Sequence, residues 1–151
     1  MSVSRNYTSR RTSITSSLVD LFRSINGTGT FLSDVSGNVY PYLKFLSDMA
    51  DFPAICVVAG QESRDYQSSG YKDRYLSFRI IIFVSEENPL TRLDAVLEDI
   101  ETLIEDNGRL LYKDKLGQTQ ATHDITVLSL STDEGTLDPI AIGEMSVRVH
   151  Y

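Results

Sequence analysis

The 151-residue sequence has one cysteine, two histidines, no tryptophan and no long apolar run. A single thiol, Cys56, cannot form an intrachain disulfide, and a reducing compartment is the simplest fit. Two histidines and one cysteine are too few for a recognisable zinc site. The longest apolar runs, 54–59 and 80–84, are far shorter than the roughly 20 residues of a transmembrane helix. We therefore expect no disulfide, no metal and no membrane span.

Basic residues are also in deficit, with 14 Lys and Arg against 21 Asp and Glu and a net charge of −7. An acidic chain without tryptophan is a poor candidate for sequence-independent binding to nucleic acid. The first residues lack the apolar stretch of a signal peptide. A hydrophobic fraction of 41% is ordinary for a globular protein and excludes disorder as a global description.

Recognisable catalytic patterns are missing as well. No glycine-rich phosphate-binding motif and no Gly-x-Ser-x-Gly motif occurs. Cys56 lies in an apolar strand run whose continuity suggests that both faces are covered, and a buried thiol is usually inert. His150 alternates with charged residues, which predicts a solvated side chain. His123 and Asp124 are neighbours in a strand, so they point to opposite faces. We expect no catalytic residue and no cofactor.

Apolar periodicity predicts two main helices. Apolar residues recur at i, i+4, i+7, i+8 and i+11 within 13–26, the pattern of an amphipathic helix. A second helix over 88–107 begins at an Asn-Pro pair and ends at Asn-Gly. Residues 1–11 are rich in Ser and Arg and predict a flexible basic N-terminal arm. Residues 12–151 form a single domain in this interpretation.

Strands are predicted at 54–59, 71–85, 125–131 and 141–151. The second and fourth of these alternate apolar and polar residues, which indicates one face against the core. The polar stretch 60–70 should be the loop of a hairpin. The order α-β-β-α-β-β then predicts an α+β fold, with a mainly antiparallel sheet and two main helices on one face.

Negative charge is concentrated in residues 86–106, which contain eight acidic residues and only one basic residue, Arg92. On a helical wheel, four of these acids form a stripe beside the apolar face: Asp94, Glu98, Glu101 and Glu105. Their three like-charge neighbour pairs cost an isolated helix about 0.6–1.5 kcal/mol. Three interpretations follow: a solvated face, a contact with basic residues of another subunit, or the wall of a passage that repels DNA.

The order of elements resembles that of the tail terminator (tail completion) proteins of long-tailed phages. The resemblance covers an N-terminal helix, the strand opened by Phe52-Pro53-Ala54-Ile55-Cys56-Val57, a polar hairpin loop, the strand 75–85, a helix after Asn88-Pro89 and two closing strands. It implies a structural protein without enzyme activity. Six copies would form a ring that caps the tail tube, stops its polymerisation and meets the neck connector.

The resemblance also implies partners and a location. The partners would be copies of the chain, the tail tube protein and neck proteins, with DNA only passing through the lumen. The protein would lie at the head-proximal end of the virion tail, and in the host cytoplasm during assembly. The family has no fixed site motif, so the interface candidates follow from charge and from predicted exposure. They are Arg5, Arg10, Arg11, Arg64, Asp65, Tyr66, Asp94, Glu98, Glu101, Glu105, Arg109, Lys113, Lys115, Asp133 and Glu134.

Two alternatives remain open at this point. One is a small-molecule enzyme or ligand-binding α+β domain, with His123, Asp124 and Arg79 as its best candidate cluster if folding brings them together. The other is a different head–tail neck protein of similar size.

Overall fold

The computed structural model describes residues 9–137 and 139–151, which form an α+β fold with a mainly antiparallel sheet. This confirms the predicted fold class. The helices and strands are α1 (Arg10–Arg23), β1 (Val39–Tyr40), the 3₁₀ helix η1 (Leu46–Asp48), β2 (Ala54–Tyr66), β3 (Lys72–Ser85), α2 (Pro89–Asp106), β4 (Leu111–Lys113), β5 (Thr119–Ala121), β6 (Asp124–Thr132) and β7 (Ile140–His150). No helix of the described part is both long and apolar enough to cross a membrane.

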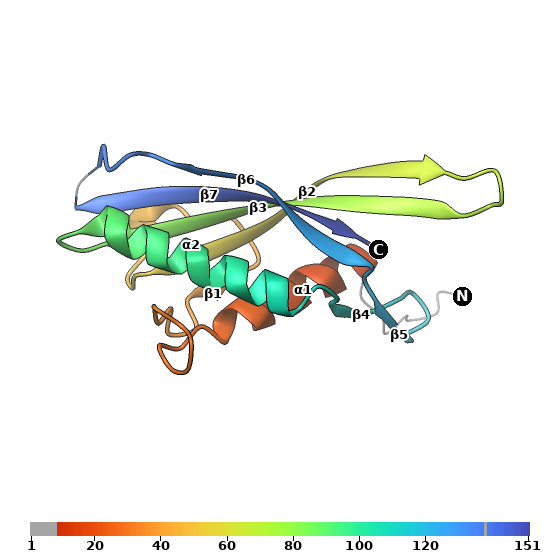
Figure 1. The fold of residues 1–151 in the computed structure, drawn as a ribbon, viewed down its shortest axis with the longest axis horizontal. Helices are drawn as coiled ribbons and strands as arrows, with labels where there is room; N and C mark the ends of the chain where they lie inside the picture. The colour runs from red at the N-terminus through yellow and green to blue at the C-terminus, as the bar shows by residue number, and fades with distance from the viewer. Residues whose placement is uncertain (1–8, 138) are drawn as a thin grey trace, which may run out of the picture.

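The main sheet has the strand order β1-β2-β3-β7-β6, and α1 and α2 lie against one of its faces (Figure 1). Strands β2, β3, β7 and β6 pair antiparallel, whereas the short β1 pairs parallel with β2. The main core lies between this face and the helices. The strand predicted at 71–85 turns one apolar face to this core, as its alternation indicates, and the residues of that face are all buried: Leu76, Phe78, Ile80, Ile82 and Val84.

The opposite face of the sheet carries a smaller apolar cluster. Cys56, Ile81 and Phe83 are buried on this side. Residues of the segment 40–52 pack over them, η1 included. Both faces of β2 are therefore covered over 54–57, as the continuous apolar run predicted, whereas Val58 and Ala59 are half-buried. Burial raises the pKa of the Cys56 thiol, and such a thiol is a packing group and not a nucleophile.

Helix α1 begins three residues earlier than its apolar stripe indicates. The Ser9 side chain is the N-cap and accepts a hydrogen bond from the Thr12 amide at 3.2 Å. Arg10 and Arg11 therefore lie in the first turn of the helix and not in the N-terminal arm. Arginine is a good helix former and serine a good cap, so an apolar period alone does not mark the start. Arg5 lies outside the described residues.

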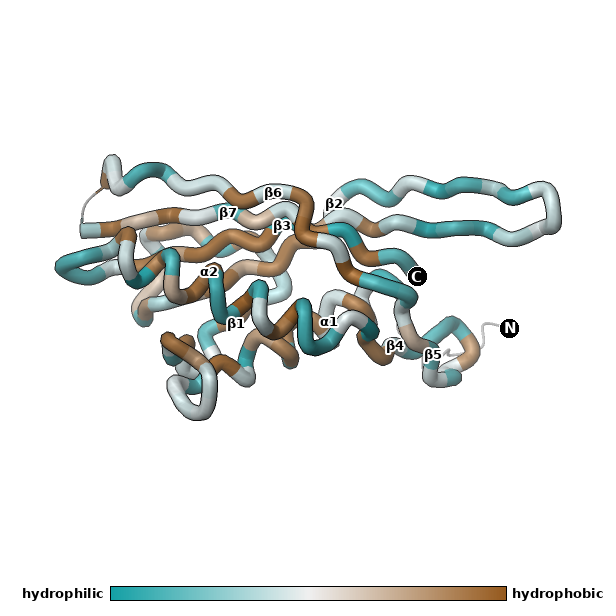
Figure 2. The backbone as a smooth tube through the Cα atoms, viewed as in Figure 1, coloured by the Kyte–Doolittle hydropathy of each residue, from teal (hydrophilic) through white to brown (hydrophobic). Residues whose placement is uncertain are grey.

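The stretch predicted as a polar loop is instead largely paired strand. After an irregularity near Gly60, β2 continues and pairs with β3 up to the pair Tyr66 and Lys72, so that the chain turns only through 67–71. We call residues 62–74 the hairpin arm. It projects beyond the rest of the sheet (Figure 1) and is mostly hydrophilic (Figure 2). Polar residues on both faces of a strand leave no apolar alternation, which is why the sequence did not indicate it.

Candidate assembly surfaces

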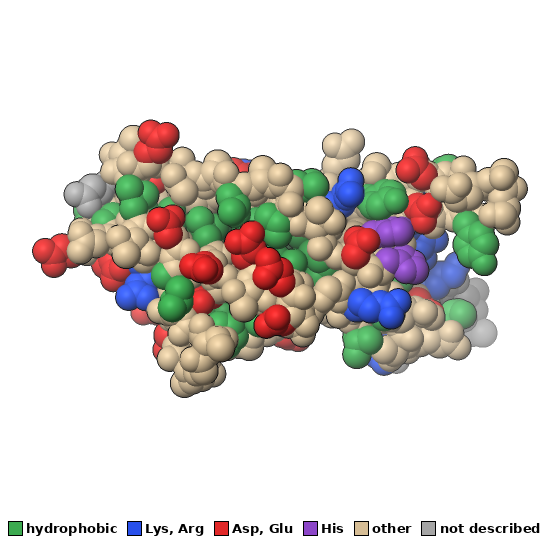
Figure 3. Space-filling model, in the orientation of Figure 1, with side chains coloured by type: hydrophobic (Ala, Val, Ile, Leu, Met, Phe, Trp, Pro, Cys, Tyr) green, Lys and Arg blue, Asp and Glu red, His purple; other side chains and the backbone are tan. Residues whose placement is uncertain are grey.

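The acidic stripe forms as predicted on α2, because the apolar residues of this helix turn toward the sheet. Asp94, Glu98 and Glu105 are exposed and Glu101 is half-buried. Acidic side chains gather over this helix in the space-filling view (Figure 3). Within the described residues, none of the four forms an ion pair. The stripe is thus an unpaired negative surface.

Beside this stripe lies the open edge of the sheet, formed by β6. Its side chains Leu128 and Leu130 are 50% and 45% exposed, and Leu90 in the first turn of α2 is 39% exposed. We call these three leucines the apolar edge. Leu90, Asp94 and Glu101 share one flank of α2 by their spacing. A Cβ built at Gly135, in the turn after β6, would meet Leu90 at 3.3 Å, so this flank faces β6.

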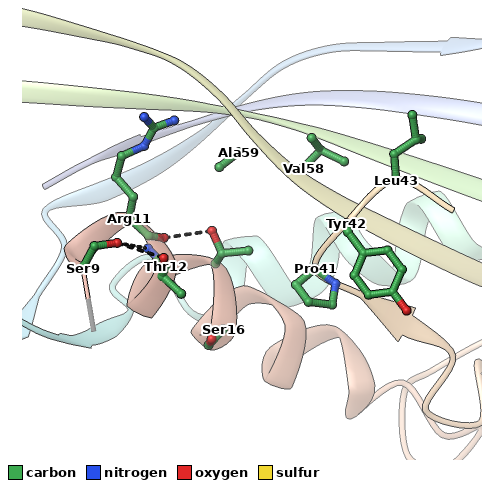
Figure 4. Close-up of a pocket in the computed structure, with 10 residues that line it drawn as sticks. Ser9, Arg11, Thr12, Ser16, Pro41, Tyr42, Leu43, Val58 and Ala59 are labelled. Carbon is green, nitrogen blue, oxygen red and sulfur yellow. Dashed lines mark hydrogen bonds between the residues drawn. The ribbon is translucent and has the colours of Figure 1, made fainter. Parts of the chain in front are cut away.

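A groove opens at the opposite edge of the sheet, along β2. Val58 and Ala59 form its floor, and its walls come from α1 and from the segment 41–43 (Figure 4). The groove has a volume of about 690 Å³. We call it the edge groove, and it is lined by Ser9, Arg11, Thr12, Thr15, Ser16, Pro41, Tyr42, Leu43, Val58 and Ala59. Tyr42 and Leu43 are each more than half exposed at its rim.

Two basic segments that are distant in sequence meet at one end of the molecule. The small hairpin of β4 and β5 docks on α1, because the Lys113 amide donates to the Ser13 hydroxyl at 2.8 Å. The exposed Lys113 and Lys115 therefore lie near the helix turn that carries Arg10 and Arg11. The Arg109 guanidinium instead donates to the Thr122 carbonyl at 3.3 Å. Leu111 and Leu116 on this hairpin are 65% and 75% exposed.

The hairpin arm presents the predicted Arg64, Asp65 and Tyr66 to solvent. Arg64 forms an ion pair with Glu62 at 2.6 Å. Tyr66 is 70% exposed, and the Lys72 ammonium lies 5.1 Å from the centre of its ring. The arm therefore carries an aromatic and several charged groups beyond the body of the protein.

Three contacts fix the base of this arm. The Tyr151 hydroxyl donates to Glu62, and the Arg11 guanidinium donates to the Gly60 carbonyl. Burial and the bond to Glu62 raise the pKa of Tyr151 to about 12. Partial burial acts to raise the pKa of Glu62, but the bonds from Tyr151 and Arg64 lower it overall. The third contact joins His150 to Asp73 at 3.0 Å.

The prediction of a solvated His150 is wrong. Its side chain is 19% exposed, stacks on Tyr75 with ring centres 4.6 Å apart, and lies 4.6 Å from the ring of His123. The pairing of β6, β7 and β3 brings these residues together across three strands. Arg79 instead pairs with Glu144 at 2.6 Å, so the alternative cluster of His123, Asp124 and Arg79 does not form around it.

The acidic tip lies in the turn after β6. Asp133 is half-buried and accepts from the Gly135 amide at 3.1 Å, whereas Glu134 is exposed with a positive φ of 58°. No group of three or more His, Cys, Asp or Glu side chains within the described ranges could hold a metal ion.

One charged residue that matters to the fold is absent from the candidates. Asp99 is 2% exposed and accepts hydrogen bonds from the amides of Leu32 and Ser33, at 2.9 and 2.8 Å. Arg92 donates to the Leu32 carbonyl at 3.0 Å. Together they fix the loop after α1 on the flank of α2 away from β6. In the sequence, the burial of Asp99 is indicated only by its position at the border of the apolar face of its helix.

The open edge at β6 and the groove along β2 are surfaces on which another chain can pair with the sheet, as a component of an assembly requires. Comparison with known proteins gives the family. The family model described as Bacteriophage Tail Tube Terminator Protein matches residues 8–151. The chain belongs to this family.

One curated protein agrees with this assignment, and one solved structure shares the fold. The chain is 31% identical over 150 residues to Tail tube terminator protein p142 of Escherichia phage T5, covering 93% of this chain and 92% of that protein. A chain in the structure of the virion of a native gene transfer agent particle shares the fold, with a TM-score of 0.64 at 10% identity. That match covers 95% of this chain and 98% of the other.

Family membership decides several expectations drawn from the sequence. The resemblance to tail terminator proteins is confirmed. The chain is a structural protein of the phage virion tail and not an enzyme, as predicted. The alternative of a small-molecule enzyme is therefore set aside. The interface residues remain predictions.

Proposed function

We propose that copies of this chain form a closed ring on the head-proximal end of a phage tail tube. The ring, of six copies as the family resemblance implies, stops tube polymerisation and offers a surface to the neck connector. DNA passes through its lumen without sequence-specific contacts. The observation that carries this proposal is the family match over residues 8–151, together with the 31% identity to a tail tube terminator protein.

The surfaces of the domain support a ring. A head-to-tail contact needs two different, complementary patches, and repetition of such a contact closes into a ring when the rotation permits. The apolar edge and the edge groove lie at opposite edges of the sheet and differ in character. The hairpin arm projects beyond both surfaces, so it remains available to the tube protein or the connector.

A tube-growth assay tests this function. The cognate tube protein is polymerised, the purified chain is added to growing tubes, and tube lengths are measured by negative-stain microscopy. We expect elongation to stop and a ring to be visible at one tube end. Tubes that grow to the same length with and without the chain would contradict the proposal.

A variant with a shortened hairpin arm tests which partner the arm contacts. Residues 66–72 are replaced by an Asn-Gly turn, which suits a two-residue hairpin and is flanked by the paired residues Asp65 and Asp73. The replaced residues are all exposed, so we expect the variant to fold. Loss of termination would assign the arm to the tube protein. Normal termination with failed joining of heads would assign it to the connector.

A further inference from the structure

We propose that the ring is built by one repeated contact, in which the apolar edge and acidic stripe of one copy dock into the edge groove of the next copy. In this contact β6 of one copy runs antiparallel beside β2 of its neighbour. The inference rests on the proposed ring and names its interface.

The directions of the strands permit such a continuation. β2, β3, β7 and β6 alternate in direction, so β6 is antiparallel to β2. A neighbour in the same orientation places its β2 beside β6 and preserves the alternation. On β2 the short β1 pairs only with Ile55 and Cys56. The backbone at Val58 and Ala59 is therefore left without a strand partner from β1, at the floor of the edge groove.

The two helices cover the other strands of the sheet more fully than they cover β6, the strand that would meet the neighbour. α1 packs on β1, β2 and β4, and α2 packs on β3 and β7. Neither helix packs on β6 to a comparable extent, and its core-facing Val127 and Leu130 remain partly exposed. In the proposed contact α1 of the neighbour covers these side chains. Thr12 and Ser16 on the groove side of α1 are small, which permits close approach.

Apolar side chains match across the proposed contact. Leu128 and Leu130 on one copy would meet Pro41, Tyr42 and Leu43 on the next, all of which are exposed in the free chain. An open apolar strand edge is otherwise a site of uncontrolled pairing between chains. A second copy is thus the occupant that covers both edges at once.

Charge complementarity gives the contact its direction. The stripe carries four unpaired negative charges on α2. The neighbour presents Arg11 in the lining of the edge groove, Arg10 next to it in the first turn of α1, and Lys113 on the hairpin that docks on α1. These opposite charges attract. Two copies that meet stripe to stripe repel one another, so the arrangement also disfavours a symmetric dimer.

Charge reversal on the two sides provides the test. One variant carries Glu98→Lys and Glu101→Lys, and the other carries Arg10→Glu and Arg11→Glu. The first variant neutralises the stripe and places two lysines opposite the arginines, and the second places two glutamates opposite the acidic stripe. For each variant alone we expect self-association at least roughly tenfold weaker than that of the wild type. Native mass spectrometry and sedimentation velocity measure it, and thermal unfolding checks that each variant folds.

Mixing the two variants gives the sharper outcome. The stripe of the first variant, which carries lysines, is complementary in charge to the groove of the second, which carries glutamates. The unchanged acidic stripe of the second variant is complementary to the unchanged groove of the first. We expect alternating rings with equal numbers of both variants. Asp106→Lys, on the opposite flank of α2, is the matched control and should assemble as the wild type does.

Defined results overturn the inference. Rings of either reversed variant with wild-type stability, or no mixed rings when both variants are folded, would contradict the interface. Intact rings that have lost only their hold on tubes would assign the groove to the tube protein instead. Wild-type rings that fail to stop tube growth contradict only the proposed function. A wild-type chain that is monomeric both free and on tubes contradicts both.

Discussion

The Tyr151 hydroxyl donates a hydrogen bond to the Glu62 carboxylate and so joins the end of β7 to the base of the hairpin arm. The Tyr151 amide also donates to the Arg74 carbonyl at 2.9 Å, on the other strand of the arm. The Tyr151 ring packs edge-on against Tyr112, with centres 5.8 Å apart. The arm is therefore held at its base by buried contacts while its tip projects into solvent.

Removing the Tyr151 hydroxyl should destabilise the protein and change its response to alkali. We expect Tyr151→Phe to lower the free energy of unfolding by about 1 kcal/mol. The pKa of this hydroxyl is raised from 10.0 to about 12, so its contribution is full below pH 10 and is lost as the pH rises toward 12. Urea unfolding across this range measures the loss.

In the Tyr151→Phe variant, the free energy of unfolding should fall less between pH 10 and pH 12 than it does in the wild type. Tyr66→Phe is the control, because this tyrosine is exposed on the arm and should leave the pH profile unchanged. Identical profiles for the wild type and Tyr151→Phe would show that the bond to Glu62 does not couple folding to pH.

The contact between Asp73 and His150 should be visible in the titration of Asp73. Hydrogen bonds from Gln67 and His150 lower the pKa of this carboxyl below its ordinary value. Its stabilising contribution is therefore present above the ordinary carboxyl pKa and is lost as the pH falls through the lowered value. We expect His150→Gln to move the pKa of Asp73 upward in a carboxyl NMR titration. An unchanged pKa would remove His150 as a cause.

Loss of the Asp99 carboxylate should be costly because the amides of Leu32 and Ser33 would be left without acceptors. We expect Asp99→Ala to lower the free energy of unfolding by about 2–3 kcal/mol, measured by denaturant titration. Asp94→Ala on the same helix is the control and should change it by less than about 0.5 kcal/mol, because Asp94 is exposed. Equal effects would mean that the buried bonds add nothing.

Close packing between β7 and α2 requires glycine at position 143. A Cβ there would lie 2.8 Å from a methyl group of Leu93, which is itself fully buried. We expect Gly143→Ala to cost about 1–3 kcal/mol in thermal or urea unfolding, because the leucine has little room to move. Gly108→Ala, with no atom within 4 Å of the added group, should be nearly neutral. A neutral Gly143→Ala would show that Leu93 repacks freely.

Elements with a strong apolar period were predictable from the sequence. The helix predicted at 88–107 is found at Pro89–Asp106, and the alternating residues of β3 and β7 point to the core as expected. These patterns work because a strand turns successive side chains to opposite faces and a helix repeats every 3.6 residues. The sequence also placed the net charge on one helix, and the acidic stripe lies there.

The remaining features depend on contacts between distant residues, so only the tertiary structure decided them. The arm is a paired ladder of polar residues, which has no apolar period to reveal it. The burial of Asp99 depends on a loop more than 60 residues away, and the approach of His150 to His123 and Asp73 depends on strand pairing. The edge groove exists because α1 and the segment 41–43 leave part of β2 uncovered. Local apolar patterns determined the main helices and the buried strands, and packing between those segments determined which surfaces remain open for assembly.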